Sequence, residues 1–176
     1  MGIASLDTIL PIRARARFFD KESPMAEAIA AYLHYLSIFV LFALLTFEHV
    51  QLKLPLDLPR ARSLMRVDIA YGITAGVVLA TGLARALWYG KGSAYYLHNA
   101  LFHAKVSLFV LVAVLSLLPT LVIARWRSTV KAGKVPQVSE RQGSLLINLI
   151  RLELALLVVI PLLAVLMARG YGMFDV

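Results

Sequence analysis

Cysteine is absent from all 176 residues of the chain. Disulfides, thiolate metal sites, iron–sulfur clusters and covalently attached haem are therefore excluded. The sequence also lacks catalytic-serine, phosphate-loop and zinc-protease motifs, internal repeats and low-complexity tracts. Charge is scarce as well, because charged residues make up 16% of the chain and hydrophobic residues 60%. Such a composition excludes a soluble globular domain.

Four long apolar segments dominate what the sequence does contain. They cover residues 25–50, 64–89, 99–124 and 145–168. Each is long enough to cross ~30 Å of hydrocarbon as a helix that rises ~1.5 Å per residue. Between the first two segments we expect Pro55 and Pro59 to break the helix, and Gly90 and Gly92 to make the next turn; the stretch 128–142 is the longest and most polar connection. The pattern predicts an all-α polytopic membrane protein, with one four-transmembrane-helix bundle over residues 25–176.

Most basic residues lie between the apolar runs or near their ends, and the net charge of the chain is +8. This placement indicates membrane topology and contact with anionic lipid, and it argues against nucleic acid as a partner. Residues 1–24 are basic and carry Pro11 and Pro24. We expect an interfacial tail on lipid head groups there, with a docking arm for another subunit as the alternative.

The distribution of lysine and arginine predicts the orientation of the bundle. The two connections on one side of the membrane carry nine of these residues, against seven on the side of the termini. Since the cytoplasmic side holds the excess, we expect both termini to be periplasmic.

Small residues in the second segment, Gly72, Gly76 and Ala80, recur at a four-residue spacing. This spacing lets helices approach closely. It predicts packing within the chain, or else the seam of a homodimer.

Ionisable residues within the spans fall into two groups by depth, and the inner group is balanced in charge. Its members are Glu48, His49, Arg66, Asp68, Arg151 and Glu153. Balanced charge at membrane depth favours a structural ion-pair cluster. A proton path or a site for a quinone head group is the alternative.

The outer group is cationic and contains no carboxylate. Its members are His34, Arg85, His98, His103 and Lys105. Either Lys105 is neutral, or an anionic partner should supply the missing charge. Haem would do so, with imidazoles on the iron and its propionates on Arg85 and Lys105. Lipid phosphate would also fit. Alternatively, the Arg85 and Lys105 side chains extend to the lipid head groups, and no cofactor is needed.

Two resemblances extend this interpretation. The runs "YLHYLSIFVLFALLTFEH", "RVDIAYGITAGVVLATGLAR" and "GKGSAYYLHNALFHAK" resemble an uncharacterised family of bacterial four-helix inner-membrane proteins, over about residues 28–172. That resemblance implies a location in the bacterial inner membrane and no particular activity.

More distantly, the chain is similar to the haem-containing four-helix bacterial protoporphyrinogen oxidase family. The early histidine of that family's first helix corresponds to His34. Its third-helix tryptophan–leucine–histidine–any–lysine motif corresponds to residues 101–105, which read Leu-Phe-His-Ala-Lys. The fourth helix departs from the pattern, since Arg151 and Glu153 are two residues apart and no asparagine precedes the glutamate. The resemblance implies haem b on His34 and His103.

Two functional hypotheses follow. The first is a b-type haem redox protein that passes electrons to a quinone or a respiratory partner, with His34 and His103 on the iron and His98 as the alternative second ligand. The second is a non-enzymatic accessory or scaffold subunit of a larger membrane complex that binds lipid. A transporter is a third class with less support, because no broken-helix pair is present.

Overall fold

The computed structural model describes residues 24–89 and 93–174, whose regular elements are all helices, with no β-strand in these ranges. The four long helices are α2 (Pro24–Gln51), α3 (Leu58–Leu87), α5 (Ala100–Arg125) and α7 (Glu140–Ala168). Two short helices, α4 (Ser93–Leu97) and α6 (Arg127–Lys131), lie in the connections. All four long helices are long and apolar enough to span a membrane, so the predicted four-helix membrane fold is confirmed. The predicted N-terminal tail lies outside the described residues, except for Pro24.

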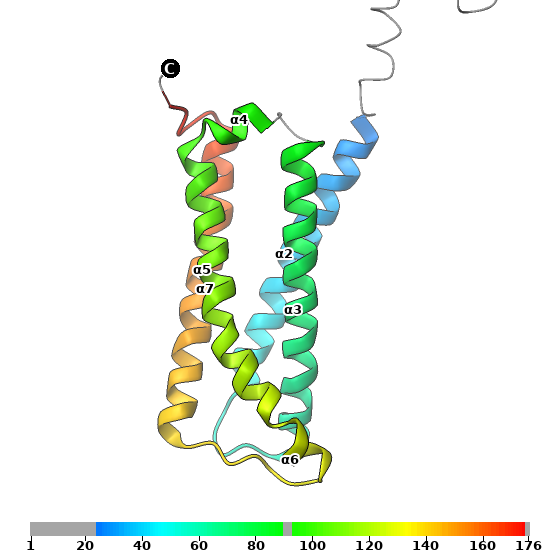
Figure 1. The fold of residues 1–176 in the computed structure, drawn as a ribbon, viewed down its shortest axis with the longest axis vertical. Coiled ribbons are helices and arrows are strands. Elements are labelled where there is room, and N and C mark those ends of the chain that lie inside the picture. The colour runs from blue at the N-terminus through cyan, green and yellow to red at the C-terminus, as the bar shows by residue number, and fades with distance from the viewer. Residues whose placement is uncertain (1–23, 90–92, 175–176) are drawn as a thin grey trace, which may run out of the picture.

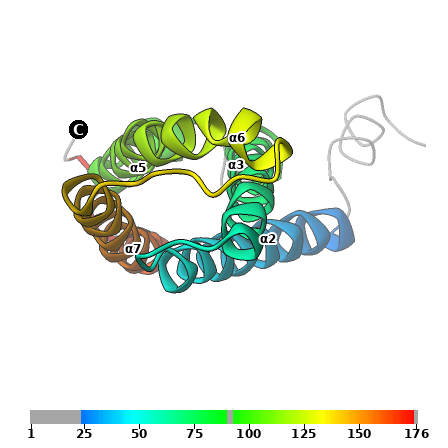
Figure 2. The ribbon, with the colours of Figure 1, turned by 90° about the horizontal axis from the view of Figure 1, so that it is seen from below.

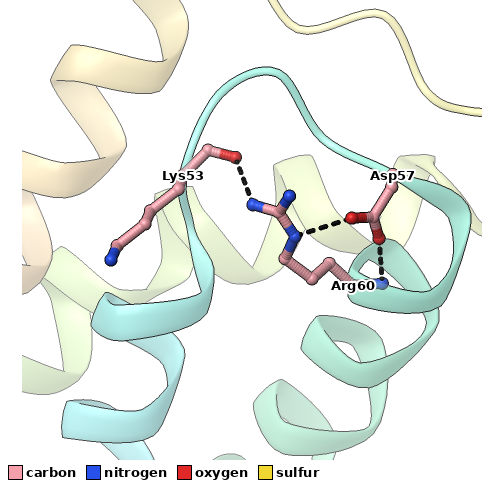
Figure 3. A network of polar contacts seen from close by, with 3 residues as sticks. All are labelled: Lys53, Asp57 and Arg60. Carbon is pink, nitrogen blue, oxygen red and sulfur yellow. Dashed lines mark hydrogen bonds and ion pairs between the residues drawn. The ribbon is translucent and has the colours of Figure 1, made fainter.

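The start of α3 differs from the prediction, because this helix begins at Leu58 and has Pro59 in its first turn, where we expected Pro59 to break a helix. Proline is well tolerated in a first turn, whose N–H groups have no partner within the helix. Asp57 caps the turn by accepting a hydrogen bond from the Arg60 backbone N–H at 2.8 Å. The Arg60 side chain also donates to Asp57 Oδ2 at 2.8 Å and to the Lys53 carbonyl at 3.2 Å (Figure 3). The backbone N–H of Arg60, followed by its side chain, lowers the pKa of Asp57.

The last helix also begins earlier than predicted, at Glu140, because Ser139 caps it. The Ser139 hydroxyl accepts from the backbone N–H of Gln142 at 3.2 Å. The connection before this helix is not wholly irregular, since α6 forms its first part.

The helices pack as two pairs, α2 with α3 and α5 with α7 (Figure 1). Seen along the bundle, they follow one another in the order α2, α3, α5, α7 around a closed ring (Figure 2). We call the end with α6 and the α2–α3 connection the loop end, and the opposite end, with α4, the terminal end. Most fully buried apolar side chains lie toward the loop end, among them Leu52, Leu64, Leu146 and Ile150. The outer faces of the helices carry large exposed apolar side chains, as a hydrocarbon surrounding requires.

A polar clamp closes the terminal end, and its centre is Asn99, which is 0% exposed. Its Oδ1 accepts from the backbone N–H groups of Leu101 at 2.9 Å and Phe102 at 3.2 Å, and so caps α5. Its Nδ2 donates to the Tyr171 carbonyl at 2.9 Å. Gly172 completes the clamp, because its carbonyl accepts from the first residue of α5 at 2.7 Å. The last described residues of the chain are therefore fastened to the start of α5.

The small-residue stripe of α3 faces outward. A Cβ placed on Gly72 or Gly76 would meet no atom within 4 Å, and Ala80 is exposed. The interpretation as packing within the chain is therefore wrong for the two glycines. The homodimer seam remains a prediction.

Candidate functional site

A cavity of about 160 Å³ lies between the four long helices, in the half of the bundle toward the terminal end. Its walls come from all four helices and are almost entirely apolar, with Ile38, Phe109 and Ile160 among them. His34 and Lys105 are its two ionisable members. The volume matches the ~150 Å³ of an engineered apolar cavity that binds benzene, and it is below the ~300 Å³ at which drug-sized sites begin. The space suits one ring or part of one acyl chain.

The imidazole of His34 is held in a defined orientation by α3. Its Nδ1 lies 2.9 Å from Thr81 Oγ1. The single hydrogen of this hydroxyl goes to the Val77 carbonyl, 2.7 Å away, so Nδ1 of His34 is the donor. This assignment, made from the hydrogen-bond network, leaves the lone pair on Nε2. Gly82 gives the ring its space, since a Cβ there would lie 3.1 Å from His34 Cε1.

Two further cations of the predicted outer group accompany His34. Arg85 and Lys105 lie close enough to act electrostatically on its ring. The Lys105 ammonium lies 5.3 Å from the centroid of the Phe102 ring, and the Arg85 guanidinium lies 5.0 Å from that of Tyr35. Neither cation has an acidic partner within 4.0 Å in the described part of the chain. The structure thus brings together three of the five predicted residues as a cationic group without a counter-charge.

His103 does not join this group. It is exposed, its Nε2 lies 3.0 Å from the Leu97 carbonyl, and it does not line the cavity. The reason is helical phase: Phe102 and Lys105 face the cavity, and His103 is turned ~100° from Phe102 around the helix axis. The predicted pairing of His34 with His103 is therefore not formed.

The alternative ligand, His98, is also exposed, and its Nδ1 lies 2.8 Å from the Ala94 carbonyl. With neither His98 nor His103 at the cavity, the described residues do not fit a haem held by two histidines. His34 alone keeps a nitrogen lone pair at the cavity. Haem b stays a prediction that nothing in the fold supports.

In the half of the bundle toward the loop end, three carboxyl groups meet from three helices. Glu48 of α2, Asp68 of α3 and Glu153 of α7 are 2%, 6% and 0% exposed. Glu48 is close enough to interact electrostatically with both of the others. Their hydrogen-bond donors are hydroxyls: Tyr71 donates to Glu153 Oε2 at 3.3 Å, and Thr120 donates to Asp68 Oδ1 at 2.7 Å.

The arginines of the predicted ion-pair cluster lie elsewhere. Arg66 and Arg151 are exposed, and Arg151 donates through Nε to His49 Nε2 at 3.2 Å. Among the described residues the one ion pair within 4.0 Å joins Arg60 and Asp57. The prediction that Arg66 and Arg151 form ion pairs with Glu48, Asp68 and Glu153 is therefore wrong.

Sequence spacing contains the signal that would have shown this. Arg66 and Asp68 are two residues apart, and so are Arg151 and Glu153. Residues two apart on a helix point ~200° from each other, so an acid that faces the bundle turns its arginine neighbour outward.

The chain was compared with protein families, curated proteins and solved structures. Residues 26–172 match the family model described as "Predicted membrane protein (DUF2214)". The chain belongs to this family. Membership confirms the predicted resemblance to an uncharacterised family of membrane proteins and assigns no activity. No curated protein and no solved structure matches the chain. Similarity to the haem-containing oxidase family therefore remains a prediction from the sequence, as do the bacterial inner membrane and the orientation of the termini.

Proposed function

We propose that the protein binds one amphiphilic molecule of the membrane in the cavity lined by His34 and Lys105. The molecule has an anionic oxygen-bearing head group and an apolar body. The head group lies at His34, Arg85 and Lys105, and the apolar body fills the space beside Phe109. This is the lipid-binding form of the accessory-protein hypothesis.

The unpaired charge of Arg85 and Lys105 carries the proposal. Ionisable groups at membrane depth are costly and are found where they meet a partner or a pathway. Lys105 lies five residues inside α5, which places it ~7 Å from the start of the helix, and it lines the cavity. Arg85 Nε is buried and has no hydrogen-bond partner among the described residues. An anionic head group supplies both the counter-charge and the missing acceptor.

Contacts with aromatic rings argue against the simpler explanation that both cations extend to the membrane surface. Lys105 and Arg85 lie over the rings of Phe102 and Tyr35, which holds them against the bundle. His34 adds selectivity, because its Nε2 lone pair accepts a hydrogen bond from a hydroxyl of the same head group. A head group with both an anionic oxygen and a hydroxyl, such as a singly protonated phosphate, satisfies all three side chains.

The test is native mass spectrometry of the protein purified from membranes in mild detergent, followed by extraction and identification of the retained molecule. Lys105→Gln removes one charge-assisted contact, worth ~1.5–3 kcal/mol, and should weaken binding about ten- to a hundredfold. Lys134→Gln, which makes the same change at an exposed position of the connection before α7, should retain wild-type occupancy.

Equal occupancy in the two variants, or a wild-type protein with no bound amphiphile, would contradict the proposal. An absorbance spectrum of the same preparation distinguishes the redox hypothesis from the amphiphile proposal. A Soret band that His34→Ala removes and His49→Ala retains would overturn the amphiphile in favour of haem.

A further inference from the structure

We infer that Glu48, Asp68 and Glu153 form a proton-binding site inside the membrane-spanning bundle, distinct from the amphiphile cavity. Glu48 and His34 are fourteen residues apart on α2, which separates the two sites by ~21 Å along the helix. None of the three carboxyl residues lines the cavity. The inference therefore stands independently of the proposed function.

The depth of the three carboxyl groups is the first argument. Asp68 lies ten residues inside α3, or ~15 Å from its start, and Glu153 lies thirteen residues inside α7, or ~20 Å from its start. Both are almost fully buried. Taking a single ionised carboxylate out of water costs several kcal/mol unless it is paired, and three together also repel one another.

The absence of positive charge around them is the second argument. The side chains that face the cluster are Glu48 from α2, Asp68 and Tyr71 from α3, and Glu153 from α7. From α5 comes the uncharged Thr120. The nearest basic residues in sequence are His49, Arg66 and Arg151. Both arginines are exposed, and Arg151 donates to His49. No ion pair reaches any of the three carboxyl groups within the described ranges.

An unsatisfied oxygen is the third argument and shows what the cluster takes up. Glu153 is 0% exposed, and its Oε1 has no hydrogen-bond partner among the described residues, while Tyr71 serves the other oxygen. A buried acceptor without a donor costs ~1–3 kcal/mol, and more when it is charged. A proton bound by the cluster turns one carboxyl into a hydroxyl donor. It thereby removes a negative charge and lowers the cost of burying an oxygen that has no donor.

A metal ion is a poorer occupant than a proton. In the residues that the structure describes, no three histidine, aspartate or glutamate side chains are arranged to hold one. Carboxyl groups that share protons within a membrane are typical of proton relays in pumps and transporters. The site therefore resembles one proton-binding step of a proton relay within the spans.

Infrared spectroscopy of the full chain in lipid nanodiscs tests the inference directly. A protonated carboxyl has its own C=O stretching band, which shifts in D₂O. We expect this band in the wild type at neutral pH, and a loss of band area in Glu153→Gln and Glu48→Gln. Glu140→Gln, a change at an exposed position of the same helix as Glu153, should leave the band unchanged.

A wild-type spectrum without a protonated-carboxyl band at neutral pH overturns the inference, and this result needs no variant. So does a band that survives in Glu153→Gln, Glu48→Gln and Asp68→Asn alike. If one glutamine variant fails to fold, the other two carry the comparison. Because glutamine copies the neutral carboxyl, the folded variants should also lose the fall in melting temperature that the wild type shows as the pH is raised through deprotonation of the cluster.

Discussion

Removing the side chain of Asn99 should weaken the attachment of the C-terminal segment to α5 and lower stability by about 2 kcal/mol. Loss of the cap on Leu101 and Phe102 costs ~1 kcal/mol. Loss of the hydrogen bond to the Tyr171 carbonyl costs another ~1 kcal/mol net. For a chain of this size the sum corresponds to a fall in melting temperature of roughly 4–8 °C.

Thermal unfolding in detergent, followed by circular dichroism, measures this effect. Asn99→Ser keeps a capping hydroxyl and removes the amide donor, so it should lose about half as much, ~1 kcal/mol. Asn148→Ala is the matched control, because Asn148 is exposed on α7, and its effect should stay within ~0.5 kcal/mol. If Asn99→Ala unfolds at the same temperature as Asn148→Ala, the clamp does not stabilise the terminal end.

Three further predictions use the same assay. Gly172→Ala should lower stability by ~2–4 kcal/mol, because its φ of +80° disfavours a side chain and the new Cβ would lie 2.6 Å from Leu101 Cγ; a neutral outcome would mean that this contact relaxes freely. Gly72→Ala should instead raise stability by up to ~1 kcal/mol, since nothing lies near it and alanine favours the helix; a loss would indicate a close helix partner from a second chain. The pKa of Asp57 is lowered from its ordinary value of 3.8, so its contribution to stability is complete above pH 3.8 and is lost as the pH falls through the folded-state pKa. Asp57→Asn should therefore flatten the acid side of the profile of melting temperature against pH, and an unchanged profile would exclude the Asp57–Arg60 contact as its source.

Hydropathy was sufficient to predict the number and type of the helices, because crossing hydrocarbon imposes a length and a composition that few other structures share. The boundaries were less accurate, since capping depends on single side chains. Pro59 was interpreted as a helix breaker, although an aspartate two residues before it marks a helix start. An asparagine ahead of an apolar run is the same kind of signal for α5, but its contacts with residues more than seventy positions away could not be read from the sequence.

The sequence predicted the depth of the candidate-site residues along their helices but not the face of the helix on which each residue lies. Counting residues along a helix places His34, Arg85 and Lys105 at compatible heights, and the structure does bring these three together. Height alone also admitted His103, which faces away from the cavity. The angular position of each residue decides which neighbours it meets, and it depends on which helices pack together. That arrangement arises from the whole bundle and is not a property of any one segment.

The clamp at Asn99 also has a kinetic consequence for the cavity. It fastens the residues that follow α7 to the first turn of α5, so these two helices are joined at the terminal end. The α2–α3 pair has no such fastening to them among the described residues at that end. The cavity is lined by exposed apolar side chains such as Leu79 of α3 and Val106 of α5, so the proposed amphiphile would reach it between the two helix pairs, within the plane of the membrane. Its rate of exchange should depend on the thickness and fluidity of the surrounding lipid more than on the composition of the water outside.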